Sequence, residues 1–517
     1  MRGARPFALS LLPLFLLVPA AQAGHWDFTP TISLREIYSD NIGLSETDPQ
    51  SDWVTELTPG FTLRGQSDAF RMNLNASSQN LYYHDAAIAD GDHTQSNPQL
   101  TLSSTTTLLP SLFYVDIGGS AGQRLVSDSN RGSYDNIALS GDRTDYSTYT
   151  IAPYLRHRAR NGIFFEARAE RGVSEFDRDD PNRNDVLHDA TTENYRVRLD
   201  NQAMNTGLHW SVVGTRRYID RKSETLADPD FRSAQIDLSY QLSTTLAVLG
   251  RAGRSESELG GFDSDRNGDY SAGGFQWSPN RRFNLSALAG SGYSDAEMNW
   301  KPSRRTDFSL GYRDTDIGLV AGPSWRASAK FRGRSLTSSL SYNEEVTTEQ
   351  QLVLDHTEFV PFIDQNGNPV IDPVTHQVLG QNVNFFAIAD DEFERHRGAL
   401  STVWKARRAT INLTLSKEDR QYLVRDELDN ESYGGAINFS WPLAAGTSLL
   451  SQYREQHGEF TSDGAKEDFQ LASLGLRIDL SKRSYTSLSV QKVQQDSDRG
   501  GRSYDEGRVI AELNMQF

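Results

Sequence analysis

The nine residues VIAELNMQF (509–517) alternate between apolar and polar side chains up to the last residue of the chain. Successive side chains of a strand point to opposite faces, so one face of this segment would carry Val509, Ala511, Leu513, Met515 and Phe517. Chain ends of soluble proteins usually fray into water, and they rarely need a large aromatic residue beside the terminal carboxylate. The stretch therefore presents two alternatives: the last strand of a soluble β-sandwich, or the last strand of a barrel in a membrane.

The N-terminus predicts export from the cytoplasm. Residues 1–23 combine a basic start, an apolar run (7–18) and a small-residue ending. These are the parts of a secretory signal peptide, which we expect to be cleaved between Ala23 and Gly24. The apolar run is too short to span a bilayer as a helix. The mature domain would then be residues 24–517.

The composition excludes several kinds of site and several classes of protein. The chain has no cysteine, which excludes disulfides and thiolate metal sites, and no long apolar run after the signal peptide, which excludes membrane-spanning helices. A hydrophobic content of 37% fits a soluble protein, and it equally fits a barrel in which only every second strand residue meets lipid. The formal charge of −17 argues against a nucleic-acid partner.

The rest of the chain repeats alternating segments separated by breaks. FRMNLNASSQNLYY (70–83) shows the alternation. Short breaks such as SPNR (278–281) and SKR (481–483) alternate with long acidic ones such as SEFDRDDPNRNDVLHDATT (174–192). This arrangement predicts an all-β fold: a single transmembrane antiparallel β-barrel of about 24 strands, within a range of about 20 to 26. We expect no plug domain, and both termini at the short-turn, periplasmic end.

In such a barrel the last strand must pair with the first. Every backbone donor and acceptor in lipid needs a partner, and a closed sheet has no free edge. We therefore expect residues 509–517 to be the closing strand, with their apolar face toward lipid. Leu513, Met515 and Phe517 would form the terminal signal for the barrel assembly machinery. The soluble sandwich is the less favoured alternative.

A short motif, Trp-x-Pro-x-Arg-Arg, occurs at 277–282 and again at 300–305. Trp277 and Trp300 would lie at the bilayer surface, where aromatic side chains anchor to headgroups. The prolines belong at a strand end because proline cannot donate to a strand ladder. Trp441 is followed by Pro442 in a similar but less complete motif, and it is a third expected interfacial anchor.

Two N-terminal stretches resemble a known family. WDFTPTISLREIYSDNIGL (26–44) and SDWVTELTPGFTLRG (51–65) are similar to the start of the β-barrel porin type 2 family. Within it they resemble the outer-membrane proteins associated with exopolysaccharide operons and the PEP-CTERM/exosortase system. The matching features are the turn at 38–41, the strand at 54–59 and the later Trp-x-Pro-x-Arg-Arg strands. The resemblance implies a Gram-negative outer-membrane barrel that serves polysaccharide export, and it carries no catalytic residues.

Charged residues on the polar strand faces would line a water-filled interior, because charges facing hydrocarbon are costly. The lumen-lining candidates are Arg71, Glu166, Arg168, Arg196, Arg198, His209, Arg217, Asp237, Arg477, Asp479 and Glu512. Two interpretations stay open. The wall is either a plain hydrated surface, or one whose guanidinium groups and paired charges contact the hydroxyl and acid groups of a sugar polymer.

Motifs for catalysis and cofactor binding are missing from the sequence. It contains no H-E-x-x-H, no G-x-S-x-G, no Walker loop and no dinucleotide fingerprint. Residues 263–268 begin like a calcium loop, but Gly274 stands where that loop needs a glutamate. We therefore expect no cofactor, no metal site and no enzymatic activity. A lipid-modifying barrel enzyme is the least favoured alternative.

The expected function is a channel of the Gram-negative outer membrane that exports an extracellular or capsular polysaccharide. A general diffusion porin and a structural or adhesive barrel are the alternatives. Expected partners are outer-membrane lipids and lipopolysaccharide, the barrel assembly machinery and polysaccharide export components, with no nucleic acid. The longest loop (347–392) is the expected constriction of the pore.

Overall fold

The computed structural model describes residues 24–88, 91–125, 134–139, 143–176, 188–201, 207–222, 228–258, 267–317, 322–347, 359–361, 380–382, 393–423 and 426–517. Its strands are β1 (His25–Ser39), β2 (Asp52–Gln66), β3 (Phe70–Tyr83), β4 (Thr94–Leu109), β5 (Phe113–Leu125), β6 (Arg143–Arg158), β7 (Phe164–Phe176), β8 (Ala190–Asp200), β9 (Leu208–Arg221), β10 (Asp230–Gln241), β11 (Leu246–Glu258), β12 (Gly268–Asn280), β13 (Phe283–Ser291), β14 (Tyr293–Ser303), β15 (Thr306–Thr315), β16 (Gly322–Arg332), β17 (Leu336–Thr347), β18 (Phe359–Pro361), β19 (Gly380–Asn382), β20 (Phe393–Lys405), β21 (Thr410–Tyr422), β22 (Asn430–Ala444), β23 (Thr447–Phe460), β24 (Lys466–Ser481), β25 (Ser484–Ser497) and β26 (Tyr504–Gln516).

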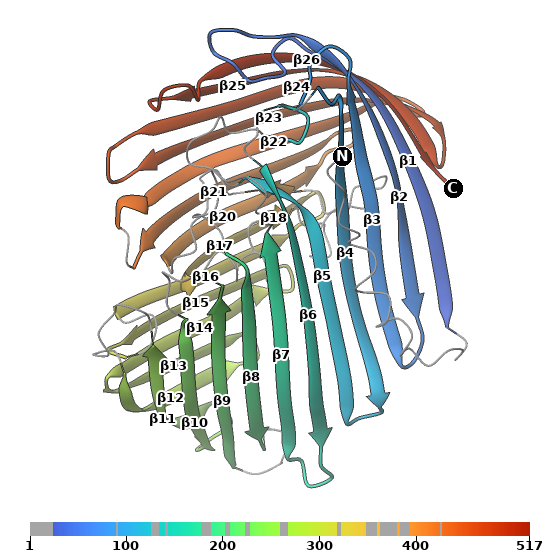
Figure 1. Ribbon diagram of the computed structural model, residues 1–517. Helices are drawn as coiled ribbons and strands as arrows, with labels where there is room; N and C mark the ends of the chain where they lie inside the picture. The colour runs from blue at the N-terminus through green and yellow to red at the C-terminus, as the bar shows by residue number, and fades with distance from the viewer. Residues whose placement is uncertain are drawn as a thin grey trace.

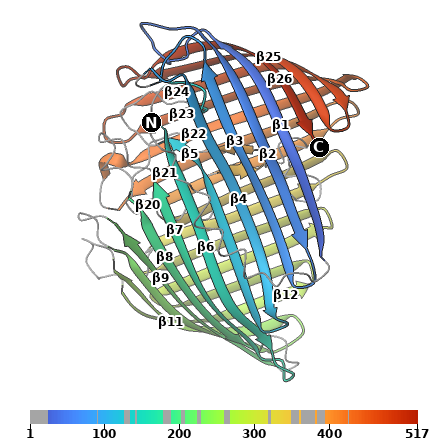
Figure 2. The ribbon, with the colours of Figure 1, turned by 45° about the vertical axis from the view of Figure 1, so that its right-hand side comes forward.

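The strands form one closed, 24-stranded antiparallel sheet, as the sequence predicted. Each strand pairs with the next along the chain, and β17 pairs with β20 across the long loop. Figures 1 and 2 show the N-terminal strands on one wall and the C-terminal strands on the other, with β1 beside β26. The short strands β18 and β19 pair separately within the long loop.

The ring closes through the C-terminal segment 509–516. Leu34 lies opposite Leu513, and Ile32 opposite Met515, in the antiparallel β1–β26 pair. The amide of Phe517 donates a hydrogen bond of 2.9 Å to the carbonyl oxygen of Pro30. Residues 509–516 are therefore the closing strand, and the sheet has no free edge at this seam.

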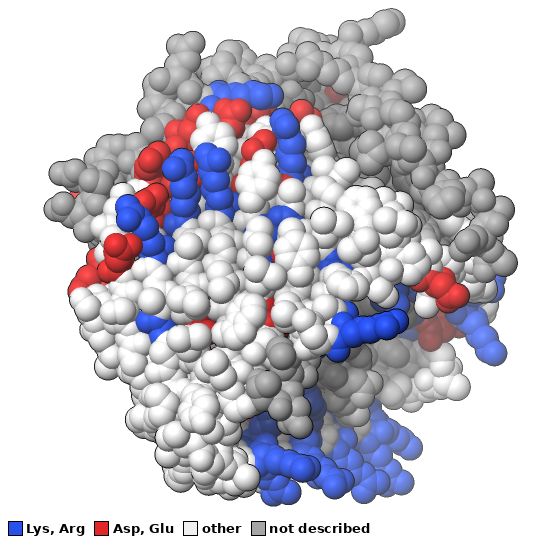
Figure 3. Space-filling model, turned by 90° about the horizontal axis from the view of Figure 1, so that it is seen from below, with Lys and Arg blue, Asp and Glu red and all other residues white. Residues whose placement is uncertain are grey.

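The outer face of the barrel is apolar over its middle. Large hydrophobic side chains point away from the interior on alternate positions, and many remain substantially exposed, among them Leu340 at 49% and Leu488 at 58%. A closed sheet with an outward apolar band is the form in which β-structure spans a membrane. In Figure 3 a broad uncharged band separates a zone of mixed blue and red side chains from a zone of blue side chains alone.

The tryptophans expected at the interface lie on this outer face. Trp277, Trp300 and Trp441 are 44%, 43% and 43% exposed. The strand register shifts just after Trp277 and Trp300, where the motif prolines sit, and again after Pro442. Proline has no amide hydrogen to donate, and each of these prolines lies where the hydrogen-bond ladder is irregular near the end of its strand. The anchoring role of these tryptophans stays a prediction.

The breaks alternate in length as the sequence indicated, with one exception. The β13–β14 hairpin lies at the long-loop end but turns on the single residue Gly292. Its φ of 66° is left-handed, a conformation that glycine adopts without steric cost. Among the described residues, no helix is both long and apolar enough to cross a membrane.

Candidate solute pathway inside the barrel

The ladder register places every lumen-lining candidate on the inner face of its strand. Arg168 lies opposite Tyr154 and Arg196, for example, and Asp237 opposite Arg251 and Ser211, while the lipid-facing residues occupy the alternate positions. The other candidates follow the same parity: Arg71, Glu166, Arg198, His209, Arg217, Arg477, Asp479 and Glu512. The interactions of these side chains with their partners indicate which of them are available to a solute.

Most of these side chains are paired across the inner wall. Arg168 binds Asp116 at 2.6 Å and Glu170 at 3.1 Å. The remaining pairs are Arg156–Glu166 (2.8 Å), Arg198–Asp200 (2.8 Å), Asp237–Arg251 (2.6 Å) and Arg477–Asp479 (2.9 Å). Glu512 accepts a hydrogen bond of 2.7 Å from the hydroxyl of Tyr485. Arg477–Asp479 is the pair in which both members come from the sequence-predicted set.

Several basic side chains on the inner wall have no ion-pair partner among the described residues. Arg71, Arg196 and Arg326 are three of them, and they are exposed on their inner faces. Arg196 lies directly opposite Arg168, so two like charges face each other across the β7–β8 ladder. Exposed guanidinium groups without a carboxylate nearby are available to an anionic solute.

Basic side chains outnumber acidic ones on two arcs of the inner wall. On β6–β9 the basic residues are Arg156, Arg158, Arg168, Arg196, Arg198, Arg217 and Arg221, against Glu166, Glu170 and Asp200. On β16–β21 they are Arg326, Lys330, Arg332, Arg395, Arg397, Lys405 and Arg420, against Glu345 and Glu418. A chain with a formal charge of −17 thus carries an excess of basic side chains on two arcs of its inner wall.

Two similar clusters of tyrosine and arginine lie on the inner wall, and the sequence analysis missed both. On β5–β7 the rings of Tyr114 and Tyr154 stack at 5.0 Å, with Arg156 and Arg168 each 5.1 Å from the Tyr154 ring.

On β11–β15 Tyr270 and Tyr293 also stack at 5.0 Å. Arg251 and Arg313 lie 5.3 Å and 5.9 Å from the Tyr293 ring. In the sequence these tyrosines occupy the alternate positions that form the polar strand faces, and this pattern could have identified them. Aromatic faces beside guanidinium groups form amphipathic surfaces in a polar wall.

A buried charge network occupies the β20–β21 part of the wall. Glu418 accepts from Arg395 at 2.7 Å and from Arg420 at 2.7 Å, and Arg397 lies 3.8 Å away. The side chains of Arg395, Glu418 and Arg420 are 1%, 2% and 3% exposed. Three guanidinium groups around one carboxylate make this network structural, since its members are held by each other away from water.

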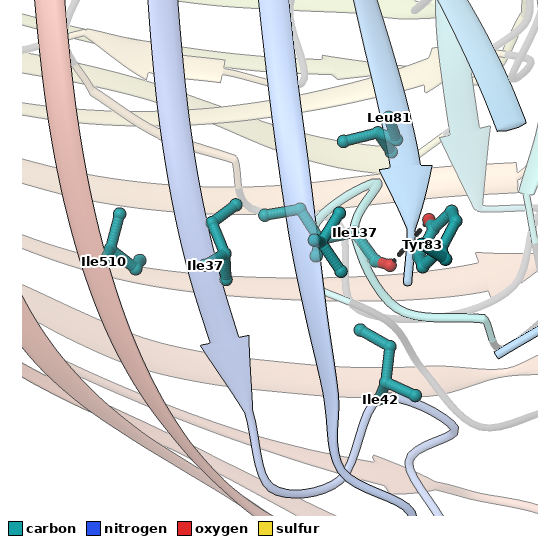
Figure 4. Packing of buried hydrophobic residues seen from close by; sticks show 7 residues of the cluster. Ile37, Ile42, Leu81, Tyr83, Ile137 and Ile510 are labelled. Atoms are coloured by element: carbon teal, nitrogen blue, oxygen red, sulfur yellow. Dashed lines mark hydrogen bonds between the residues drawn. The ribbon is translucent and has the colours of Figure 1, made fainter. Parts of the chain in front are cut away.

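Two segments from the long-loop end fold inward and cover part of the inner wall. The first is Asn41–Leu44 after β1, and the second is residues 134–139 between β5 and β6. Ile42 and Ile137 pack with Ile37, Leu81 and Ile510 from the inner faces of β1, β3 and β26, and Figure 4 shows this cluster. The covering loop segments therefore explain why apolar residues occupy some positions of the otherwise polar inner faces.

Polar contacts hold residues 134–139 in place. The hydroxyl of Tyr83 donates to the carbonyl oxygen of Ile137 at 2.8 Å, the dashed line in Figure 4. Arg508, whose side chain is 0% exposed, pairs with Asp135 and with Glu506. Burial, with the Asp135 carboxylate next in effect, raises the pKa of Tyr134 well above the usual value of a phenol. The segment is therefore docked on the wall by buried charge and by apolar contact.

A second apolar cluster extends this cover toward β24 and β25. Leu44, which is 0% exposed, packs with Phe469, Leu471, Val493 and Tyr504. The two loop segments also bond to each other, since the amide of Leu139 donates to the carbonyl oxygen of Ile42 at 2.9 Å. The wall around the β26–β1 seam is consequently lined by protein rather than by open lumen.

The loop expected to constrict the pore, 347–392, lies outside the described residues apart from Thr347 at the end of β17 and the β18–β19 pair. In that pair Phe359 faces Asn382 and Pro361 faces Gly380. Across the described ranges, no three His, Asp or Glu side chains gather closely enough to hold a metal ion. On the inner face of β9, the buried Nδ1 of His209 has no hydrogen-bond partner within the described part of the chain.

Comparisons with known proteins show similarity at the level of architecture. No protein-family model matches the sequence, and no curated protein matches it either. Among solved structures, the FrpB iron transporter from Neisseria meningitidis (F5-1 variant) superposes with a TM-score of 0.50 at 10% identity, over 95% of this chain and 83% of the transporter. The siderophore receptor PirA from Pseudomonas aeruginosa gives a TM-score of 0.41 at 10% identity, over 96% and 81%. At this identity the likeness concerns the barrel fold alone.

Proposed function

We propose that this barrel is a Gram-negative outer-membrane channel through which an acidic extracellular polysaccharide passes. The observation that carries the proposal is the pair of cationic arcs on the inner wall, with Arg196 and Arg326 exposed and unpaired among the described residues. The resemblance of residues 26–65 to the β-barrel porin type 2 family supports the polysaccharide and the outward direction of transport.

The chemistry of the wall suits a charged sugar polymer. Guanidinium groups bind carboxylates through paired hydrogen bonds, and the Tyr114–Tyr154 and Tyr270–Tyr293 clusters add amphipathic ring edges beside them. Conduction requires binding that favours entry and is spread over several weak sites. Separate arginines on two arcs meet this requirement better than a single deep pocket would.

Planar-bilayer recordings of the purified protein test the proposal. We expect the reversal potential in a salt gradient to show anion selectivity, and uronate oligosaccharides to block the current at concentrations where neutral dextrans of equal size do not. The variant R196Q/R326Q should lose roughly half of the selectivity, since it removes unpaired charge from both arcs. K417Q, on the outer face of β21, is the matched control and should behave as wild type.

A general diffusion porin is the competing function. It would show no preference for uronate over neutral oligosaccharides, and R196Q/R326Q would change conductance without changing block. Cells that lack this chain would then secrete unchanged amounts of polysaccharide. Either result would remove the export assignment and leave the barrel as a non-specific channel.

A further inference from the structure

Four neighbouring short turns carry a repeated pairing of an outward aromatic residue with one or two basic residues. The turns follow one another around the barrel, because β12 to β17, β20 and β21 are consecutive neighbours in the sheet. Their basic residues are Arg281 and Arg282, Arg304 and Arg305, Arg334, and Arg407 and Arg408. No acidic residue interrupts these turns, at 281–282, 304–305, 333–335 and 406–409.

The aromatic residue stands at nearly the same spacing each time. Trp277, Trp300, Phe331 and Trp404 precede the first arginine of their turn by three or four residues, and they are 44%, 43%, 41% and 45% exposed on the outer face. A strand rises about 3.3 Å per residue, so the cations lie roughly 10 Å beyond the aromatic rings toward the chain turns. Aromatic rings mark the boundary between headgroup and acyl chain, which places the cations at the depth of lipid phosphates.

Basic residues are most concentrated in the turns of this arc, and outside it the turn at 482–483 is also basic and the turn at 159–163 carries Arg160. Four other short turns, at 67–69, 110–112, 242–245 and 445–446, carry no basic residue. On β15, beside the turn at 304–305, Asp307 pairs with Lys301 at 3.6 Å. Six of the turn arginines, Arg281, Arg282, Arg304, Arg305, Arg407 and Arg408, are exposed and have no ion-pair partner among the described residues. Figure 3 shows a zone at the lower edge of that face where blue side chains gather without red ones.

We propose that the short turns of β12–β21 form a basic surface that binds the headgroup phosphates of anionic phospholipids in the adjoining leaflet. Each short turn lies two strands from the next one, which is roughly 10 Å along the sheet. Successive turns are therefore about one lipid headgroup apart. The membrane is the partner that the geometry favours over an acidic protein, because each of these basic turns is coupled to an outward aromatic anchor. The surface does not depend on what passes through the barrel.

Lipid selectivity in vesicles tests this surface directly. The protein is reconstituted in vesicles of about 80% phosphatidylcholine and about 20% phosphatidylglycerol, and spin-labelled lipids of each headgroup report the fraction held at the barrel. We expect wild-type protein to prefer phosphatidylglycerol about twofold, averaged over the perimeter, since the most basic turns cover only part of it. The variant R281Q/R282Q/R304Q/R305Q/R407Q/R408Q should shift the ratio toward one, and high salt should lower the wild-type preference in the same direction.

The matched control removes charge elsewhere on the outer face. Lys417, Lys466 and Lys492 are exposed at the long-loop ends of β21, β24 and β25, so K417Q/K466Q/K492Q should keep the wild-type preference. If the sixfold variant does not fold, R407Q/R408Q should lose about a third of the preference. Wild-type protein without a preference for phosphatidylglycerol would overturn the proposal and leave an acidic protein as the partner. A sixfold variant that retains the preference would overturn it as well.

Discussion

Two parts of the inner wall follow the same alternation of side chains but differ in their contact with water. Around the seam of β26 and β1, loop segments cover the wall, and Arg508 is 0% exposed among Glu506, Asp135 and Tyr134. On β7–β9, Arg196 occupies an equivalent inward position and is exposed. The same residue type on the same kind of strand is thus a structural ion-pair partner in one place and a solvent-facing cation in the other.

The difference teaches that alternation decides the face of a side chain but not its surroundings. A covered arginine must be matched by buried carboxylates, because an uncompensated buried charge is costly. An uncovered arginine needs no partner, because water solvates it. Inner-wall charges near the seam are therefore expected to contribute to stability, and those on the open arcs to solute contact.

The largest effect expected from this comparison concerns the two arginines themselves. Arg508→Ala leaves Glu506 buried without its cation, so it should lower the free energy of unfolding by about 3–5 kcal/mol. Arg196→Ala should change it by less than about 0.5 kcal/mol. Urea unfolding of both variants in lipid vesicles measures the contrast. Equal losses in the two variants would show that the seam is as wet as the open arc.

The second prediction compares the two faces of one strand. Trp210 points to lipid on β9 and Ser211 points to the interior beside Asp237. Trp210→Arg should destabilise the barrel by about 2–4 kcal/mol if the site lies near the bilayer midplane. Ser211→Arg should be mild, because water and a carboxylate are available to it. Folding yield and urea midpoint in vesicles report both, and similar tolerance of the two changes would contradict the assigned faces.

A smaller effect is expected from removing one of the hydrogen bonds that hold the inner cover. Tyr83→Phe removes the donor to the carbonyl oxygen of Ile137 and should cost about 1 kcal/mol. The same change at Tyr114, whose ring stacks on Tyr154 on the open arc, is the control and should be nearly neutral. Hydrogen exchange at residues 134–139 should rise in Y83F alone. Unchanged protection there would show that apolar contact suffices to hold the segment.

The smallest effect on stability is expected at the C-terminus. Phe517 is 61% exposed, and its described polar contact is the backbone hydrogen bond to Pro30. Its deletion should lower the free energy of unfolding by less than about 1 kcal/mol, yet it should reduce insertion into the outer membrane if Leu513, Met515 and Phe517 form the assembly signal. Heat-modifiable migration of membrane fractions separates the two. Normal insertion of the deletion variant would remove the signal from these residues.

Much of the architecture could be predicted from alternation alone. The period of two along 70–83 and 509–517 indicated strands, the alternating break lengths indicated an antiparallel barrel, and the strand count was right. The inward faces of Arg168, Asp237 and Glu512 follow from the same parity. These features depend on side-chain direction along one strand, which is a local property.

The partners of those side chains could not be predicted. Arg168 meets Asp116 of a strand two positions away in the sheet, and Asp135 reaches Arg508 from the other end of the chain. The break between β13 and β14 also departs from the pattern, since one glycine replaces the long loop. Pairings of this kind depend on register between strands and on how loops fold, and neither leaves a periodic signal in the sequence.

Alternation along the chain was enough to predict a closed barrel with an apolar outside and a charged inside, because backbone groups in lipid must all be hydrogen-bonded and side chains alternate between the two faces. Which inward charges are buried and which are exposed to water became clear from the folded structure alone. That choice rests on residues 41–44 and 134–139 folding over the seam and leaving the arcs of β6–β9 open. Burial depends on what packs above a side chain, and residues 134–139 come from a loop distant in sequence from β1 and β26, which they cover.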